Sequence, residues 1–324
     1  ALAARQGRAD LRCLTLTFGG SHPDAPDEAQ EAARFCANAG LAHASACLDE
    51  GELRSSRTAF LDAMDQPTID GVNVFFISRA VRPAGYKVAL SGVGGDELFG
   101  GYPSFTELPY WKRLLALPSR IPAAAPVYRH ACASIRKLIG RGSPKVDGLL
   151  TYGRDLAGAY FLKRGLFMPW ELPELIGKEM AVEGLRRLGL AQRIASTLEG
   201  TPRDDRARIA CLESAWYMRN QLLRDADWAA MAHSVEVRTP LVDSVLTARL
   251  AAHLRGPGAL GKKDLAEAAG VGSGRPKTGF TPPLRAWIEN ERALPEWKEA
   301  DRKLGRAQHW SRRWAYAVYR RHIR

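Results

Sequence analysis

Hydrophobic and polar positions follow different patterns before and after residue 103. Before it, three runs with strand-like character, at 11–18, 41–48 and 87–91, are separated by stretches in which apolar residues recur with helical spacing. The helical stretches are the end of a helix at 1–8 and the segments 27–39, 52–64 and 71–81. Strands alternating with helices of about 10–15 residues are typical of a parallel sheet covered by helices. The pattern therefore predicts a doubly wound, Rossmann-like α/β core over residues 1–103.

After residue 103 the spacing of apolar residues is mostly helical. Prolines break up the stretch as far as residue 126, and long helical patterns follow at 204–233 and 244–254. Glycine-rich segments at 256–261 and 270–274 predict loops. We therefore expect residues 104–324 to form a largely helical second part that packs against the first.

The composition is that of an ordinary globular protein, with 46% hydrophobic and 25% charged residues. No apolar run approaches the ~20 residues needed to span a bilayer, and the first residues lack the apolar core of a signal peptide. The cysteines have no paired spacing, which favours reduced thiols, a cytoplasmic location and no zinc site. The five cysteines are Cys13, Cys36, Cys47, Cys132 and Cys211.

The formal net charge of +12 raises the question of a nucleic-acid partner. Residues 261–324 contain fifteen Lys or Arg against seven Asp or Glu, so most of the excess lies in this tail. Its aromatic residues, such as Trp310 and Trp314, could stack on bases, but their spacing also suits the buried faces of amphipathic helices. We favour a solvated basic helical tail, and nucleic acid is the less favoured partner.

The most informative feature is the glycine-rich turn that follows the predicted strand at 87–91. Five glycines lie between Gly92 and Gly101, so the backbone can approach a ligand closely and adopt positive φ angles. In open α/β sheets, ligands bind outside the carboxyl ends of strands. Free backbone N–H groups there suit phosphate, whereas the carboxylate of Asp96 suits a magnesium ion.

The full string is Ser-Gly-Val-Gly-Gly-Asp-Glu-Leu-Phe-Gly-Gly-Tyr, from Ser91 to Tyr102. It strongly resembles the signature of glutamine-dependent asparagine synthetases, in their ATP-pyrophosphatase domain. The resemblance implies an adenine nucleotide alpha hydrolase-like fold that binds ATP and Mg²⁺. It also implies an ATP-dependent ligase, which adenylates the side-chain carboxylate of aspartate and amidates it with glutamine-derived ammonia.

The resemblance also implies roles for individual residues. The backbone of Leu16 would contact adenine, and Asp96 would face magnesium and pyrophosphate. In the segment Gly-Lys-Lys-Asp-Leu, Lys262 matches a family lysine that contacts the phosphates of ATP, with Lys263 as the reserve. The residues expected to hold the nucleotide are Ser91, Gly92, Gly94 and Gly95.

A second stretch, residues 224–243, also resembles the family, through its Ser-x-Glu-x-Arg-x-Pro-x-x-Asp pattern. Taken alone it is a helix end followed by a proline-containing turn. We expect Glu236 and Arg238 to pair with buried partners and, together with Glu97, to support the site, and we interpret His233 as structural. The family resemblance extends to a loop near the site at 275–283.

The chain departs from the family pattern in two ways. Asparagine synthetases of the best-known type have a glutamate at the position of Val93, where it helps ammonia attack the adenylate. The pyrophosphate loop of the family, Ser-Gly-Gly-x-Asp-Ser, does not occur in this sequence. We therefore expect the chain to be a fragment that lacks the central strand of the sheet, which would lie between the strands at 11–18 and 87–91. We expect this fragment to be inactive by itself.

Several alternatives stay open. Val93 and the segment 65–71 are compatible with an amidotransferase that acts on a different carboxylate, for example in a surface-polysaccharide pathway. The charge would suit a tRNA-modifying ATP pyrophosphatase, and the missing phosphate loop would suit a non-catalytic binding module. The expected partners are the carboxylate substrate and ammonia from a glutaminase domain absent from this chain, with no membrane and with a homodimer as an open alternative.

Overall fold

The computed structural model divides the described chain into two compact units, each discontinuous in sequence. Unit 1 comprises residues 1–93, 221–240 and 263–324, and unit 2 comprises residues 94–220 and 241–262. The structure describes residues 2–7, 10–18, 28–121, 124–139, 142–270, 295–305 and 308–323.

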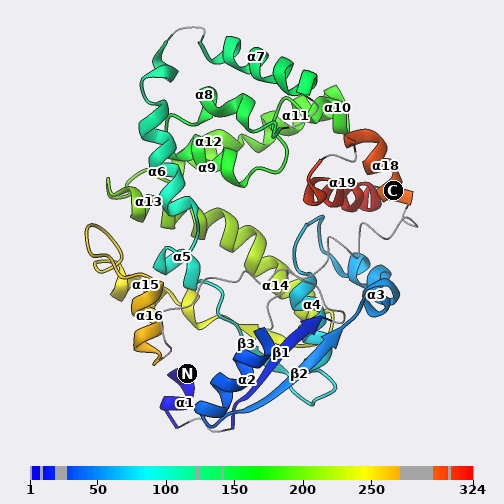
Figure 1. The fold of residues 1–324 in the computed structure, drawn as a ribbon, viewed down its shortest axis with the longest axis vertical. Helices are drawn as coiled ribbons and strands as arrows, with labels where there is room; N and C mark the ends of the chain where they lie inside the picture. The colour runs from blue at the N-terminus through cyan, green and yellow to red at the C-terminus, as the bar shows by residue number, and fades with distance from the viewer. Residues whose placement is uncertain are drawn as a thin grey trace. The chain divides into compact units, whose positions relative to one another are not determined.

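Unit 1 contains two pairs of parallel strands (Figure 1). Strand β1 (Arg12–Phe18) pairs with β2 (Ala42–Leu48), with Leu16 opposite Ala46. Strand β3 (Val88–Leu90) pairs with β4 (Glu236–Arg238), with Ala89 opposite Val237. The parallel pairing and the α/β class agree with the sequence prediction. A single doubly wound sheet is not confirmed, because the described strands form two separate two-stranded sheets.

Several helices of unit 1 pack on these strands, and one apolar cluster connects the two sheets. Val81 of α4, Ala230 of α14 and Val235 form its buried centre. Leu14 of β1 and Ala89 of β3 both pack against it, so the two sheets share this cluster. The helices are α1 (Leu2–Arg5), α2 (Glu28–Asn38), α3 (Glu50–Ala63), α4 (Val72–Val81), α14 (Arg224–Met231), α16 (Lys262–Ala268, whose first residue belongs to unit 2), α18 (Pro295–Leu304) and α19 (Trp310–His322).

Local sequence explains where several helices begin. Asp49 caps α3 by accepting a hydrogen bond from the Glu52 backbone N–H at 2.7 Å. Asp155 and Asp204 cap two helices of unit 2 in the same way. By contrast, the expectation that every early proline interrupts a helix is wrong, because Pro109 lies inside a 12-residue helix.

The described residues of unit 2 form helices joined by turns and loops, with no strand among them. Its core contains Leu108, Tyr160, Ile209 and Leu212, each at most 2% exposed. The helices are α5 (Gly95–Phe99), α6 (Ser104–Leu115), η1 (Pro118–Arg120), α7 (Ala124–Ile139), η2 (Val146–Gly148), α8 (Leu149–Tyr152), α9 (Leu156–Arg164), α10 (Leu172–Ile176), α11 (Lys178–Leu188), α12 (Leu190–Ser196), α13 (Asp205–Leu212), the π-helical η3 (Glu213–Leu223, which crosses into unit 1 at residue 221), η4 (Pro240–Val242, which begins in unit 1) and α15 (Ser244–Leu250).

The basic C-terminal tail differs from the expectation that its cations are solvated. Trp314 is 4% exposed, as an anchoring aromatic residue should be. However, Arg312 and Arg313 are also buried, at 7% and 6% exposure, and Arg313 pairs with Asp301 of α18 at 2.9 Å. The tail is therefore less of a free basic surface than its composition indicates. None of the described helices is long and apolar enough to cross a membrane.

Candidate active site

The glycine-rich turn begins in unit 1, directly after β3. The Ser91 backbone N–H donates to the Arg238 carbonyl oxygen at 2.8 Å, which continues the pairing of β3 with β4. The Ser91 hydroxyl accepts a hydrogen bond from the Val93 backbone N–H at 3.3 Å. The strand pair and this turn together fix the backbone of Ser91, and Gly92 is exposed beside it.

The turn continues in unit 2 with Gly94, whose φ of 98° lies in the region that favours glycine. A Cβ atom there would also lie 3.0 Å from the Leu241 carbonyl oxygen and 2.9 Å from a Val242 methyl group. Both constraints require glycine at this position. Gly94 and Gly95 are buried, and helix α5 follows with Asp96 in its first turn.

Unit 2 brings Asp96 and Lys262 together, although they are far apart in the sequence. The Lys262 ammonium group forms an ion pair with the Asp96 carboxylate, and the two side chains are 44% and 26% exposed. Gly101 makes this possible, because a Cβ atom there would overlap the Asp96 carboxylate and lie 2.5 Å from Lys262 Cε. The glycine after α5 therefore provides the space in which the two charged groups meet.

The loop before Lys262 is held by Arg206 of α13. The Arg206 guanidinium donates to the Leu260 carbonyl oxygen at 2.6 Å and to the Leu254 carbonyl oxygen at 3.2 Å. Gly100 leaves room for it, because a Cβ atom there would lie 2.8 Å from a guanidinium nitrogen. Arg206 of the helical unit 2 thus holds the loop that leads to Lys262 and lies against Gly100, close to Asp96.

Glu97 occupies a different environment from its neighbour Asp96. Its carboxylate is 1% exposed and accepts a hydrogen bond from the Tyr102 hydroxyl at 2.8 Å. Burial raises the pKa of Glu97, and the bond from Tyr102 only partly opposes this. Glu97 therefore supports the loop from inside and does not share the exposed position of Asp96.

A buried network beside this loop was not predicted from the sequence. Glu213 is 0% exposed and accepts hydrogen bonds from Arg164 Nη2 at 2.7 Å and from the Ser104 hydroxyl at 2.5 Å. The Arg164 guanidinium also lies 3.6 Å from the ring centre of Tyr217. Burial opposes the charge on Arg164, but the Glu213 carboxylate outweighs it and raises its pKa. The Tyr160 hydroxyl also donates to Glu213, at 3.4 Å, and we call Glu213, Arg164, Ser104 and Tyr160 the Glu213 network.

A pocket of about 350 Å³ in unit 1 includes Leu16. Leu16 is 7% exposed, so only a small part of it is open to solvent. Asn73 of α4 also lines this Leu16 pocket, and its Oδ1 atom is buried without a hydrogen-bond partner among the described residues. Asn73 is a polar residue on a largely apolar helix, and this signal was available in the sequence. The lining residues are Leu14, Thr15, Leu16, Ala32, Asn73, Val74 and Ile77.

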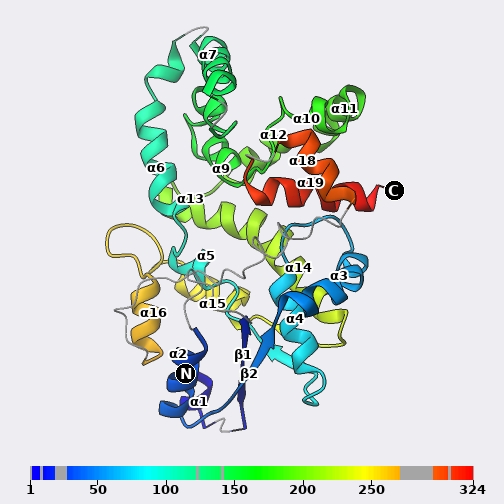
Figure 2. The same ribbon diagram turned by 45° about the vertical axis from the view of Figure 1, so that its right-hand side comes forward.

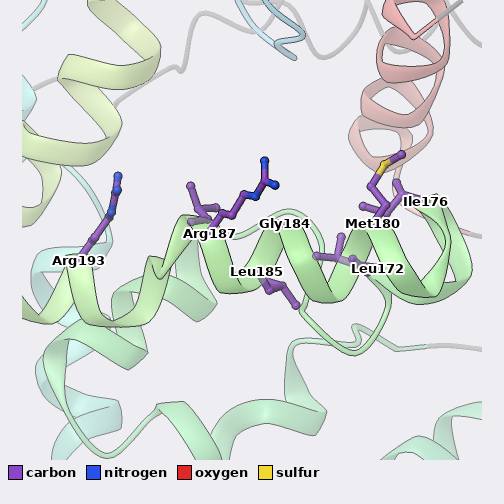
Figure 3. Close-up of a pocket in the computed structure, with 9 residues that line it drawn as sticks. Leu172, Ile176, Met180, Gly184, Leu185, Arg187 and Arg193 are labelled. Carbon is purple, nitrogen blue, oxygen red and sulfur yellow. The ribbon is translucent and has the colours of Figure 1, made fainter.

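A larger pocket of about 420 Å³ lies in unit 2, between α10, α11 and α12 (Figure 3). Its lining is apolar apart from Arg187 and Arg193. It contains no carboxylate and none of the predicted site residues, so its chemistry does not fit a magnesium nucleotide.

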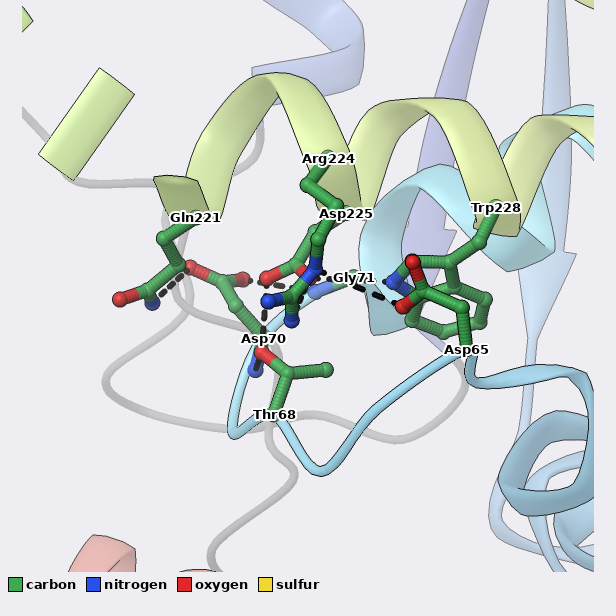
Figure 4. Close-up of polar contacts among 8 residues, drawn as sticks. All are labelled: Asp65, Thr68, Asp70, Gly71, Gln221, Arg224, Asp225 and Trp228. Atoms are coloured by element: carbon green, nitrogen blue, oxygen red, sulfur yellow. Dashed lines mark hydrogen bonds and ion pairs between the residues drawn. The ribbon is translucent and has the colours of Figure 1, made fainter. Parts of the chain in front are cut away.

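In unit 1, the loop at 65–71 is fastened to helix α14 by a set of polar contacts (Figure 4). Asp225 is 2% exposed and accepts hydrogen bonds from the Thr68 hydroxyl at 2.7 Å and from Trp228 Nε1 at 3.0 Å. Burial raises the pKa of Asp225. Next to it, Arg224 lies 3.4 Å from the carboxylate of Asp65. The contacts hold the loop in one position and leave Asp65 about half exposed.

Other predicted residues lie in simpler surroundings. Glu236 and Arg238 bond to each other at 2.8 Å on β4 and are 58% and 60% exposed, so the expectation of buried partners is wrong for this pair. His233 packs against the Phe75 ring, with ring centres 4.4 Å apart, in a setting that suits a structural residue. Lys263 is exposed next to Lys262. The predicted loop at 275–283 lies outside the described residues.

Comparison with known proteins agrees with the resemblance seen at residues 91–102. A protein of Mycobacterium tuberculosis, provisionally named as an asparagine synthetase (glutamine-hydrolyzing), is 26% identical over 322 residues, which cover 95% of this chain and 47% of that protein. Asparagine synthetase (glutamine-hydrolyzing) 1 of Bacillus subtilis is 25% identical over 305 residues, covering 91% of this chain and 45% of that protein. The chain thus spans about half the length of the curated relatives it matches. No solved structure is significantly similar to it.

The sequence profile of asparagine synthase matches residues 1–323. This match includes the glycine-rich turn, Asp96 and Lys262, and the stretch that contains Glu236 and Arg238. It confirms the family that the turn predicted, and the chain belongs to the asparagine synthase family.

Proposed function

We propose that this chain is the ATP-dependent synthetase part of a glutamine-dependent asparagine synthetase. It adenylates the side-chain carboxylate of aspartate, and ammonia from glutamine then displaces AMP. A carboxylate is a poor electrophile because its oxygen leaves badly, and esterification to AMP supplies a good leaving group. The alternative of a tRNA-modifying enzyme has less support, since the tail's Arg312 and Arg313 are buried.

The observation that carries the proposal is the pairing of Asp96 and Lys262 beside Gly101. When a carboxylate attacks the α-phosphate of ATP, negative charge builds on the phosphoryl oxygens and on the departing pyrophosphate. A fixed ammonium group stabilises that charge, and Lys262 has the required charge at an accessible position. Asp96 keeps the ammonium group oriented until the nucleotide arrives.

The residues present fit a magnesium nucleotide. Mg²⁺ bound with ATP commonly takes one or two carboxylates together with phosphate oxygens, and Asp96 is a partly exposed carboxylate on a glycine-rich turn. Mg²⁺ would neutralise phosphate charge there. In the Leu16 pocket, the unpaired Asn73 amide oxygen is a suitable acceptor for the exocyclic amine of adenine. Ser91 and Gly92 would hold the nucleotide through the turn after β3.

Val93 cannot accept a proton, so it cannot help ammonia to attack the adenylate. An amidotransferase that uses a carboxylate other than aspartate is therefore the second candidate. The segment 65–71 is compatible with this candidate, since Asp65 of the loop and Arg224 of helix α14 offer an anion and a cation side by side. These two groups could bind the carboxylate and ammonium groups of an amino-acid acceptor.

The test is pyrophosphate release from ATP by the protein expressed from its complete reading frame, with ammonium chloride as the nitrogen source. We expect release that depends on aspartate and yields asparagine. Lys262→Ala should reduce it by roughly 10²-fold or more, the scale for one positioned electrostatic group. Asp96→Asn should reduce it to a similar extent.

Lys263→Ala is the matched control, because it removes an equal charge from the adjacent position, and we expect it to be nearly silent. Equal losses for Lys262→Ala and Lys263→Ala would contradict the role of the Asp96–Lys262 pair. Pyrophosphate release with another carboxylate, but not with aspartate, would contradict asparagine synthesis and support an amidotransferase that uses a different acceptor.

A further inference from the structure

The segment from residue 110 to residue 146 has an unusual charge pattern. It contains eight Lys or Arg and no Asp or Glu. It forms α6 from its middle onward, η1 and α7, all within unit 2. None of the candidate active-site residues lies in it, so the proposed catalytic function does not account for this pattern.

Helix α7 exposes a continuous apolar stripe. Val127, Ala131, Ile135 and Leu138 recur at helical spacing, and the large residues among them, Val127, Ile135 and Leu138, are 68%, 54% and 88% exposed. The opposite side of α7 already packs inward, where Arg136 bonds to the buried Asp147 at 2.7 Å. The exposed stripe is therefore not needed to hold α7 on its unit.

A second series of exposed apolar residues lies in α6 and in the segment that follows it. Tyr110, Leu114, Leu117 and Ile121 recur at intervals of three or four residues and are 62%, 58%, 73% and 61% exposed. Figures 1 and 2 both place α7 at one end of the helices of unit 2, and it follows α6 and η1 along the chain. We call the exposed residues of both series the α6–α7 face.

The same stretch of chain carries exposed cations, some of them without an acidic partner among the described residues. Lys112 and Arg136 pair with Asp205 and Asp147. Arg113, Arg120 and Lys137 form no ion pair with any residue in the described parts of the chain. Aliphatic side chains together with unpaired cations, on a helix that lies along a surface, are the combination that binds an anionic bilayer interface.

We propose that the α6–α7 face docks on the surface of an anionic lipid membrane. The aliphatic residues enter the headgroup region, and the cations contact lipid phosphates. Such a contact needs no spanning helix. A second copy of the chain is a poorer occupant, since two acid-free faces would repel each other. Nucleic acid is also a poorer one, because Tyr110 alone among the exposed residues of the face offers a ring for stacking.

The test is flotation of the full protein with vesicles of phosphatidylcholine, with and without phosphatidylglycerol. We expect binding only to the anionic vesicles. Arg120→Glu combined with Lys137→Glu should weaken it by at least about 10-fold, because each reversal replaces attraction by repulsion. The matched control is Arg302→Glu combined with Lys303→Glu on α18, which makes the same change of charge at exposed positions and should leave binding nearly unchanged.

A second variant tests the apolar contribution. Leu117→Ser combined with Leu138→Ser alters no charge and changes two exposed residues, so the fold should be unaffected, which circular dichroism can verify. Weaker vesicle binding by this variant, and slower amide hydrogen exchange of residues 127–138 on anionic vesicles, would support the proposal. The proposal would be overturned if the protein did not bind anionic vesicles, or if the α18 control variant weakened binding as much as Arg120→Glu combined with Lys137→Glu. It would also be overturned if RNA displaced the protein from the vesicles, or if the serine variant had a lower oligomer mass than the wild type.

Discussion

Replacing Arg164 by methionine should destabilise unit 2 strongly, because it removes one partner of a buried ion pair. Glu213 is 0% exposed, and Arg164 supplies its charged partner through bonds of 2.7 and 3.0 Å. Leaving a buried charge unpaired typically costs about 3–5 kcal/mol. The Ser104 and Tyr160 hydroxyls remain as donors, so we expect a loss near the lower end, about 3 kcal/mol. That corresponds to a fall in melting temperature of roughly 6–12 °C.

The measurement is thermal and urea unfolding of the full protein, followed by circular dichroism. Lys163→Met is the matched control, because Lys163 precedes Arg164 on α9 and pairs with Glu107 at the surface, with both side chains about one third exposed. Its loss should stay below about 1 kcal/mol. Arg164→Met combined with Glu213→Leu should recover most of the stability, since both charges are then gone. Equal losses for the two single variants, or no recovery in the double variant, would refute this reasoning.

Three further results are expected. Gly71→Ala should cost about 2–3 kcal/mol in unfolding free energy, because the added methyl group would lie 2.5 Å from the Trp228 ring. Gly85 has a similar φ but open space around it, so Gly85→Ala should cost only about 1 kcal/mol. Burial, and then repulsion by a nearby arginine, lowers the pKa of His233, so the stability that His233 contributes is present above the ordinary histidine pKa and is lost as pH falls. Between about pH 7.5 and about pH 5, the wild type should therefore lose more unfolding free energy than His233→Gln does. Equal losses would contradict this assignment. Gly101→Ala should reduce pyrophosphate release as severely as loss of the candidate lysine, with little change in melting temperature, and full activity would show that the carboxylate–ammonium pair tolerates the added methyl group.

Local sequence patterns predicted the elements that local interactions stabilise. Strands β1 and β2 and helices α2, α3 and α4 lie within a few residues of their expected bounds. Strand β4 was missed, because three residues give no periodicity and only their pairing with the distant β3 makes them a strand. The continuous sheet was expected from the alternation of elements, but alternation does not specify which strands are neighbours.

Likewise, only part of the candidate site could be predicted from the sequence. The glycine-rich turn was recognisable because positive φ angles and close approaches require glycine, as at Gly94 and Gly101. The Glu213 network could not be predicted, because a glutamate inside a long helical pattern is usually solvated and only the packing of α9 against α13 and η3 buries it. Glu236 and Arg238 were expected to pair with buried residues, but they bond to each other along β4 and stay exposed.

The pairing of β3 with β4 has a consequence for how the protein is made. Val88 and Glu236 are partners, yet about 150 residues of chain separate them, and most of unit 2 lies in between. A ribosome adding roughly 5–20 residues per second completes β4 roughly 7–30 s after β3 has been synthesised. During this interval β3 lacks β4, its only strand partner in the part of the chain that the structure describes, although the helices of unit 2 can already form. We therefore expect slower translation of residues 94–220 to increase aggregation of the nascent chain.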